Sequence, residues 1–250
     1  GNVAHKANIN IAEGVTLVVG DLALGYDGDL NFMGATVVND GTIEVNKDSK
    51  FDITDVNGDA SATDGKNMTN NGLFIHNVDA AVGTAVQLMN QNGVYRCRVD
   101  DQIKLDDAYQ KWLACSVIEM VGAGQNYNLG VAEKNINYQH KHKGVNKYID
   151  IEVNTTSVTT FTNPADGSGN GDDKNIQVGN LTVMQGGLYV PYVTGTGKRE
   201  LTVNGDLTVA PTAAACNLSL YSSKKITVKE NLIVNNGATL KYAGKKQNEG

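Results

Sequence analysis

The chain has 250 residues, of which 40% are hydrophobic, a formal net charge of −6 and a sequence pI of about 5.2. Its apolar content suffices for a folded core, which argues against intrinsic disorder. The acidic balance argues against nucleic acid as a partner, because nucleic-acid-binding proteins carry a basic stripe. No run of about 18 apolar residues is present, so we expect no membrane insertion by this segment.

Short alternating runs of apolar and polar residues dominate the first hundred residues. They are Ile9–Ile11, Val15–Leu17, Val19–Leu24, Leu30–Phe32, Thr36–Val38, Thr42–Val45, Leu73–Ile75, Ala85–Leu88 and Val94–Val99. This alternation predicts β-strands with one buried face. Within Val19–Leu24 we expect a corner at Gly20-Asp21-Leu22, which matches Gly205-Asp206-Leu207. Two of the runs follow Asn39-Asp40-Gly41 and Asn70-Asn71-Gly72, and Asp-Gly and Asn-Gly pairs favour the positive φ angles of tight corners.

A polar stretch over residues 52–71 predicts a long loop between these runs. Within it, Asp55, Asn57 and Asp59 offer oxygen atoms at every second residue, and Ca²⁺ prefers carboxylate and amide oxygens. The loop lacks the Gly and the Glu that an EF-hand requires at its later positions. A solvated loop is the first interpretation, and a calcium site at Asp55, Asn57 and Asp59 is the alternative. No other cofactor is expected.

The pattern changes over residues 104–121, where apolar residues recur at spacings of three and four. This is the period of an α-helix. Asp106 and Asp107 suit its first turn, and Gly122 suits its end. We therefore expect one short amphipathic helix inserted near 104–121, with Trp112 as its apolar anchor rather than as a platform for a sugar ring.

The three cysteines, Cys97, Cys115 and Cys216, are widely spaced and odd in number. They predict neither a framework of disulfides nor a metal site. Cys97 lies in an alternating run, which favours a small residue of the core. A disulfide between Cys97 and Cys115 stays open as an alternative.

Aromatic and histidine side chains crowd the polar segment that follows the expected helix. They are Tyr127, Tyr138, His140, His142 and Tyr148. His140 and His142 would lie on one side of an extended segment, which is half of a zinc or copper site, but no further ligand is near in sequence. A solvated surface loop is the structural alternative. We take the five residues together as the best candidates for ligand binding.

The last third of the chain repeats one segment three times. The copies Ile176–Val183, Leu201–Val209 and Ile226–Val234 begin 25 residues apart (201 − 176 and 226 − 201), and a third apolar run follows each copy. A fixed period of this length indicates a repeat array. Asn recurs at the corners between runs, as at Asn180 and Asn231, and stacked Asn side chains predict a hydrogen-bonded ladder.

Three short strands per period predict an all-β fold, a single-stranded right-handed parallel β-helix of about 25 residues per coil. We expect one such domain over residues 1–250. Its parts would be N-terminal coils in 1–103, a helix-containing insertion in 104–147, and C-terminal coils in 148–250.

The lead-in Asn-Asp-Gly-Thr-Ile-Glu-Val at residues 39–45 and the repeat Val-Asn-Gly-Asp-Leu-Thr-Val at residues 203–209 carry a family resemblance. Over residues 9–46 and 176–243 the chain resembles the β-helical surface and adhesin-like proteins of Gram-negative gut bacteria. The resemblance implies an exported protein of the cell surface that binds a host or bacterial surface glycan or protein. It carries over no individual functional residue.

We therefore expect a non-enzymatic adhesin or display module that is part of a longer chain, with no catalytic residue. The chain opens without a methionine, so we expect an export signal to have been removed. The alternative is a polysaccharide-active enzyme (a lyase or hydrolase) or a glycan-binding module on the same fold. A hydrolase needs two carboxylates beside the scissile bond, whereas Asp150 and Glu152 are equally expected on the solvent face of a strand.

Overall fold

The computed structural model describes residues 7–54, 68–100, 114–124, 126–128, 135–137, 148–162, 175–190, 200–211, 217–220 and 225–242. The described residues are all-β, with 53% of them in strands and almost no helix, and their sheets are parallel. It divides into two compact units. The first contains residues 1–98, 114–117 and 141–145, and the second contains residues 99–113, 118–140 and 146–250.

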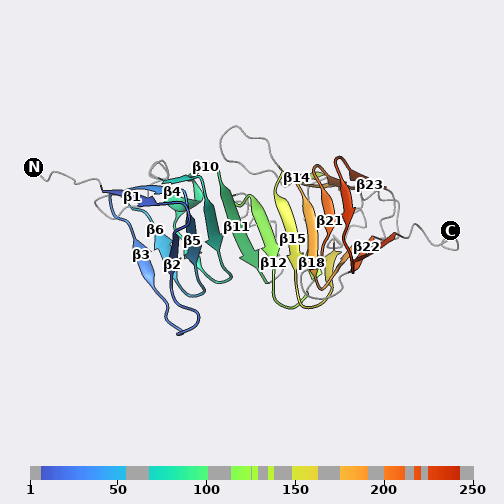
Figure 1. Ribbon diagram of the computed structural model, residues 1–250, viewed down its shortest axis with the longest axis horizontal. Coiled ribbons are helices and arrows are strands. Elements are labelled where there is room, and N and C mark those ends of the chain that lie inside the picture. The colour runs from blue at the N-terminus through green and yellow to red at the C-terminus, as the bar shows by residue number, and fades with distance from the viewer. Residues whose placement is uncertain are drawn as a thin grey trace, which may run out of the picture. The chain divides into compact units, whose positions relative to one another are not determined.

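The first unit is built from three ladders of short parallel strands (Figure 1). One ladder contains β1 (Asn8–Ile11), β4 (Thr36–Asn39), β7 (Met68–Asn70) and β10 (Asn90–Gln91); the next contains β2 (Thr16–Val19), β5 (Thr42–Val45), β8 (Leu73–His76) and β11 (Val94–Val99); the last contains β3 (Asp29–Asn31), β6 (Lys50–Asp52) and β9 (Ala81–Val82). A four-residue helix, α1 (Thr84–Gln87), follows β9. Consecutive strands of the chain thus belong to different ladders.

Equivalent side chains of successive strands stack into rows that form the core of this unit. In the ladder of β5, β8 and β11, Ile43 pairs with Phe74, and Phe74 pairs with Tyr95. All three are at most 1% exposed. The rings of Phe51 and Phe74 meet edge to face at 5.7 Å between centroids, and those of Phe74 and Tyr95 at 4.9 Å. Burying each such side chain contributes about 1.5–3 kcal/mol relative to its exposure, so the rows hold the ladders together.

The second unit repeats this arrangement. Its ladders are β15 (Asp150–Asn154), β18 (Leu181–Gln185), β21 (Leu207–Val209) and β24 (Leu232–Val234); β13 (Asn126–Asn128), β16 (Thr159–Thr162), β19 (Leu188–Val190), β22 (Asn217–Leu220) and β25 (Thr239–Tyr242); and β14 (Asn135–Asn137), β17 (Asn175–Val178), β20 (Glu200–Val203) and β23 (Lys225–Val228). Ile176 pairs with Leu201 and Leu201 with Ile226, so the three sequence repeats are confirmed as equivalent strands.

The expected helix over residues 104–121 is wrong at its C-terminal end. Val117–Met120 form the strand β12, all four residues are buried, and the Val121 N–H donates to the carbonyl of Val99 at 2.8 Å. Burial of every side chain removes the alternation that identifies a strand, so an apolar spacing of three and four was mistaken for a helix. Residues 104–113, including Trp112, lie outside the described residues.

Two other apolar runs also depart from the predicted strands. Residues 84–87 form α1 instead of extending through the run Ala85–Leu88. The chain leaves β2 after Val19, where a corner is predicted, but residues 22–24 belong to a hairpin closed by Asp21 and Tyr26 and not to a further strand.

Gly237, in Asn235-Asn236-Gly237, has the positive φ angle that such a lead-in favours, but the glycines of the lead-ins at 39–41 and 70–72 serve another purpose. Gly41 and Gly72 both precede strands and neither has positive φ. Instead, a Cβ at Gly72 would collide with the Gly41 carbonyl, and a Cβ at Gly93 would collide with the Gly72 carbonyl. These glycines stack upon one another and leave no room for a side chain, so close backbone approach explains them.

Candidate functional site

The structure describes only part of the predicted ligand-binding set. Tyr148 is half-buried and lies just before β15, and the backbone of Tyr127 belongs to β13. The remaining candidates, Tyr138, His140 and His142, lie outside the described residues, as do the calcium candidates Asp55, Asn57 and Asp59. Both sets therefore stay predictions.

A polar network lies where β5, β8 and β11 of the first unit end. The Asn77 side-chain nitrogen donates to Glu44 Oε1 at 2.9 Å and to Asn46 Oδ1 at 2.8 Å. Arg98 Nη1 donates to Asn77 Oδ1 at 2.9 Å and lies 3.8 Å from Glu44 Oε1. The carboxylate of Glu44 is thus already held by an amide and a guanidinium, an arrangement that fixes side chains of three successive strands.

Polar side chains also stack along the corners of the second unit. Asn180 donates its backbone N–H to Asp150 Oδ1 at 2.7 Å, and Asn180 Oδ1 accepts the Asp206 N–H at 2.8 Å. Asp206 Oδ1 then accepts the N–H of Asn231 at 2.9 Å. The stack therefore alternates Asp150, Asn180, Asp206 and Asn231, and it differs from the predicted ladder of Asn on Asn. Each side chain satisfies a backbone donor of the next repeat, which is a structural use.

Among the described residues of the first unit, the most exposed large apolar side chains lie in a hairpin over residues 21–26, where the sequence predicts a corner but not a hairpin. The backbone groups of Asp21 and Tyr26 exchange two hydrogen bonds at 2.7 and 3.0 Å. Asp21 Oδ1 also accepts the N–H groups of Ala23 and Leu24. Despite this order, Leu22, Leu24 and Tyr26 are 62%, 69% and 68% exposed. We call residues 21–26 the apolar hairpin.

An open depression of about 630 Å³ adjoins the apolar hairpin. Its lining residues are Val18, Gly20, Asp21, Leu22, Ala23 and Asn46. Asn46 is fixed there because its side-chain nitrogen donates to the Gly20 carbonyl at 2.9 Å. The depression therefore joins an apolar wall to a carboxylate and an amide, and it can receive a side chain or a small ring. The positive φ angles of Gly20 and Gly25, 80° and 72°, permit the turns on either side of Leu22-Ala-Leu24.

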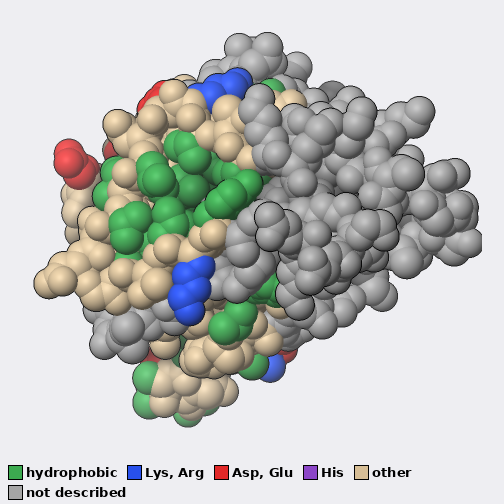
Figure 2. All heavy atoms as spheres, turned by 90° about the vertical axis from the view of Figure 1, so that its right-hand side faces the viewer, with side chains coloured by type: hydrophobic (Ala, Val, Ile, Leu, Met, Phe, Trp, Pro, Cys, Tyr) green, Lys and Arg blue, Asp and Glu red, His purple; other side chains and the backbone are tan. Residues whose placement is uncertain are grey.

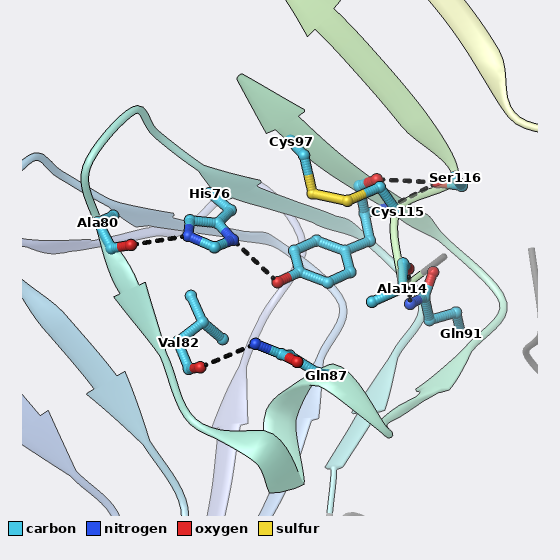
Figure 3. The surroundings of a disulfide bond; sticks show 10 residues. His76, Ala80, Val82, Gln87, Gln91, Cys97, Ala114, Cys115 and Ser116 are labelled. Atoms are coloured by element: carbon cyan, nitrogen blue, oxygen red, sulfur yellow. Dashed lines mark hydrogen bonds between the residues drawn. A yellow bond between two sulfur atoms is a disulfide. The ribbon is translucent and has the colours of Figure 1, made fainter. Parts of the chain in front are cut away.

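A buried polar cluster lies next to a disulfide in the same unit (Figure 3). His76 Nε2 lies 2.9 Å from the Ala80 carbonyl, and His76 Nδ1 lies 3.2 Å from the Tyr95 hydroxyl. A carbonyl only accepts, so Nε2 carries the hydrogen and Nδ1 accepts the hydroxyl hydrogen of Tyr95. Burial raises the pKa of Tyr95 well above its ordinary value.

The disulfide joins Cys97 of β11 to Cys115, with the two Cα atoms 5.9 Å apart. Both cysteines are buried. The prediction that Cys97 belongs to the core is confirmed, and the disulfide left open by the sequence is present. The spacing of the cysteines along the chain does not identify this pair, since the partner of Cys97 could equally have been Cys216.

The described residues contain no group of three or more His, Cys, Asp or Glu side chains that could hold a metal ion. Among the same residues, no helix has the length and apolar character required to cross a bilayer. No family model, curated protein or solved structure matches the chain.

Proposed function

We propose that this chain is a non-enzymatic adhesin or display module, exported to the surface of a Gram-negative bacterium and built as a right-handed parallel β-helix. The observation that carries its binding role is the apolar hairpin. In this proposal the hairpin contacts a host or bacterial surface protein or glycan, and the stacked repeats hold it in place.

The register of the ladders supports the β-helix. Three ladders in each unit take successive strands in turn, and equivalent corner residues of the second unit, such as Asp206 and Asn231, are 25 apart. Stacking one repeat on the next supplies backbone partners and continues the apolar rows, as a solenoid requires. In this proposal, residues 1–250 form one solenoid domain.

The disulfide supports export. Disulfides form and persist in oxidising compartments, such as the periplasm and the cell exterior, and are rare in the cytosol. Cys97 and Cys115 are both buried within the first unit, so their bond is a structural cross-link rather than an exposed redox pair.

The hairpin suits binding because it is both apolar and already ordered. Exposed clusters of large apolar side chains mark interaction sites on soluble proteins. The hydrogen bonds from Asp21 fix the turn before a partner arrives, which reduces the entropy lost on binding. Leu22 and Leu24 favour an apolar pocket on a protein, whereas Tyr26 could stack on a sugar ring.

The test is a binding screen of the whole chain against a broad glycan array and intact host and bacterial cells, together with an assay for oligosaccharide release from acidic and neutral polysaccharides. We expect binding without release. The double variant Leu22→Ser/Leu24→Ser should weaken that binding by about tenfold or more, since each lost apolar contact costs about 1–3 kcal/mol.

The matched control is Val158→Ser, which changes an exposed apolar residue of the second unit. It should bind as the unmodified chain does. Release of oligosaccharides would overturn the non-enzymatic proposal in favour of a lyase or hydrolase. Binding that survives the hairpin substitutions but is lost on alanine replacement of Tyr127, Tyr138, His140, His142 and Tyr148 would move the site to that segment.

A further inference from the structure

The apolar hairpin is an insertion at the corner between β2 and β3, and it therefore projects sideways from the ladders. Val19 of β2 pairs with Val45 of β5, and Asp29 of β3 pairs with Lys50 of β6. The chain turns this corner in ten steps in the first repeat (29 − 19) and in five in the next (50 − 45). The extra residues have no counterpart in the next repeat, and Figure 1 shows their loop, in blue, extending below β2 and β3.

The depression beside the hairpin lies on the outer face of a sheet. Ile43 and Val45 are 0% exposed, so Glu44 between them faces outward, as does its partner in register, Val18. Val18 and Asn46 both line the depression. The depression is therefore bounded by two successive repeats on their outer side, and it does not depend on the open end of the ladder.

Hydrophobic side chains of the last described strands are a different case. Figure 2 looks onto that side of the second unit and shows them gathered in one patch. Leu232 and Val234 of β24 are 54% and 44% exposed, and the ladder has no further described strand beyond them. A following repeat of the same chain would cover them, so their exposure does not indicate a binding surface.

The net charge of the chain is concentrated around the apolar hairpin. Residues 7–46 contain no Lys or Arg and six acidic residues, namely Glu13, Asp21, Asp27, Asp29, Asp40 and Glu44. The other residues contain 21 Asp or Glu (27 − 6) and 21 Lys or Arg, so their formal charges cancel. The whole formal charge of −6 thus belongs to the part of the chain that carries the hairpin.

Neighbouring cations leave this negative charge uncompensated. Lys47 and Lys50 each lie beside another carboxylate, at 3.5 and 3.3 Å. No ion pair among the described residues includes Asp21, Asp27 or Asp29, and all three are exposed. The surface around the hairpin therefore has a negative potential, which attracts cationic partners and repels acidic ones.

The polar groups of the depression favour a cation over a sugar. The amide of Asn46 donates to the Gly20 carbonyl and accepts from Asn77, so both its nitrogen and its oxygen are engaged. Asp21 Oδ1 accepts two backbone N–H groups of the turn. What the depression offers a ligand is thus a carboxylate, which accepts hydrogen bonds and donates none. Lys and Arg supply only donors, whereas a site for sugar hydroxyls needs both donors and acceptors.

We propose that the hairpin binds an exposed segment of a partner protein in which one large apolar side chain is flanked by Lys or Arg. The apolar side chain occupies the depression against Val18 and Leu22, and the flanking cations reach Asp21 and Asp27. An Arg of the partner can also stack on the exposed ring of Tyr26. This inference rests on the binding role proposed for the apolar hairpin and adds the chemistry of the partner.

Three short synthetic peptides test that chemistry by calorimetric titration of the whole chain. Each has one phenylalanine flanked on both sides by the same residue, which is lysine in the first peptide, glutamine in the second and glutamate in the third. The lysine peptide should bind about tenfold more tightly than the glutamine peptide, and the glutamate peptide should bind most weakly. An increase of NaCl from about 50 mM to about 500 mM should weaken only the lysine peptide, by about tenfold, because salt screens charges.

Substitutions locate the site. Asp21→Asn removes a charge but keeps the Oδ1 acceptor that fixes the turn, and it should weaken the lysine peptide by about fivefold and leave the glutamine peptide unchanged. Leu22→Ser/Leu24→Ser should weaken both peptides. The matched control is Asp206→Asn in the second unit, where Oδ1 likewise accepts a backbone N–H. It should bind the lysine peptide as the unmodified chain does.

The outcomes separate the chemistry of the partner from the binding role of the hairpin. Absent binding of the lysine peptide, equal affinity for the lysine and glutamine peptides, or equal losses in Asp21→Asn and Asp206→Asn would overturn the basic partner. If cells or glycans then still bind in a way that Leu22→Ser/Leu24→Ser weakens, the hairpin binds a partner of another class. Peptide and cell binding that both survive Leu22→Ser/Leu24→Ser would overturn the binding role itself.

Discussion

Several buried polar side chains in the described part of the first unit form specific hydrogen bonds, and these decide the effect of single substitutions. His76 is held between the Ala80 carbonyl and the Tyr95 hydroxyl. Asn39 donates to Asn70 Oδ1 at 2.7 Å within the same core. A buried donor or acceptor that loses its partner costs more than an exposed one, because water cannot replace the lost bond.

The raised pKa of Tyr95 predicts a stability that depends on alkaline pH. In the unfolded chain Tyr95 loses its proton near its ordinary pKa of about 10, whereas the folded chain retains the proton at higher pH. The unfolded state then binds fewer protons, so the free energy of unfolding falls as pH rises above about 10, by about 1.4 kcal/mol per pH unit from this residue. Its contribution is fully present below that pH.

Urea unfolding between pH 8 and pH 11 checks this, with Tyr95→Phe as the test variant. Tyr95→Phe should lower the free energy of unfolding by about 1 kcal/mol at neutral pH, because His76 Nδ1 loses its donor. Above about pH 10, the free energy of unfolding of this variant should fall less steeply than that of the unmodified chain. Tyr242→Phe, at an exposed tyrosine, should keep the full slope. Identical slopes for Tyr95→Phe and the unmodified chain would contradict the prediction.

A buried Asn should matter more than an exposed one in an equivalent contact. Asn70 is fully buried, accepts from Asn39 and donates to the Val94 carbonyl at 3.0 Å. Asn70→Ala should lower the free energy of unfolding by about 2 kcal/mol, since it leaves those groups unpaired. Asn92→Ala removes an exposed contact to Asn71 and should cost less than about 0.5 kcal/mol. Equal losses in urea unfolding would show that burial does not decide the cost.

Individual contacts of this kind were largely beyond sequence reasoning. A pairing of Cys97 with Cys115 and a hydrogen bond from Tyr95 to His76 depend on which strands lie side by side, and spacing along the chain does not report this. The apolar hairpin carried a usable signal, because Gly20 and Gly25 flank Leu22 and Leu24. That signal was hidden by an apolar pattern that also fits a strand.

At the scale of the element, strands that repeat and alternate could be predicted, whereas a strand with every side chain buried could not. The strands of the C-terminal repeats alternate and recur, and all were predicted. β12 has four buried residues in succession, so its apolar pattern mimics a helix. The candidate site of Tyr127 to Tyr148 lies where repetition is weakest, and there the sequence supplied composition rather than geometry.

The disulfide should raise the free energy of unfolding of the chain. Cys97 and Cys115 are separated by 18 residues, and a loop of this size predicts about 3 kcal/mol of stabilisation, chiefly by restricting the unfolded chain. Reduction with dithiothreitol should therefore lower the free energy of unfolding by about that amount in urea titrations. The double variant Cys97→Ala/Cys115→Ala should be insensitive to the reductant. A reductant effect of equal size on the double variant would assign the loss to another cause.

At the scale of the whole molecule, each repeat is covered by the one that follows it, so the contribution of a side chain depends on its place in the row. Leu207 and Leu232 are the same residue type in register on neighbouring strands, but only Leu207 is covered on both sides. The same residue type therefore contributes differently at these two positions of the row.

The two leucines predict very different responses to the same substitution. Leu207→Ala should lower the free energy of unfolding by about 2–5 kcal/mol, because it leaves a cavity in a closed row. Leu232→Ala should cost less than about 1 kcal/mol in dilute solution, since the side chain is half exposed. Thermal unfolding at low protein concentration measures both, and a large loss for Leu232→Ala there would contradict the burial gradient.

The stacking of residues 200–203 on 225–228 has a consequence for how such a chain can lengthen or shorten. Glu200 lies beside Lys225 and Leu201 beside Ile226 in a parallel pair of strands. Removal of one repeat would therefore put residues 225–228 in the place of residues 200–203, with the same direction and equivalent neighbours. Gain or loss of a single residue within a strand would instead turn every later side chain to the opposite face. Whole repeats are thus the natural unit of variation, and related chains should differ in length by whole numbers of repeats.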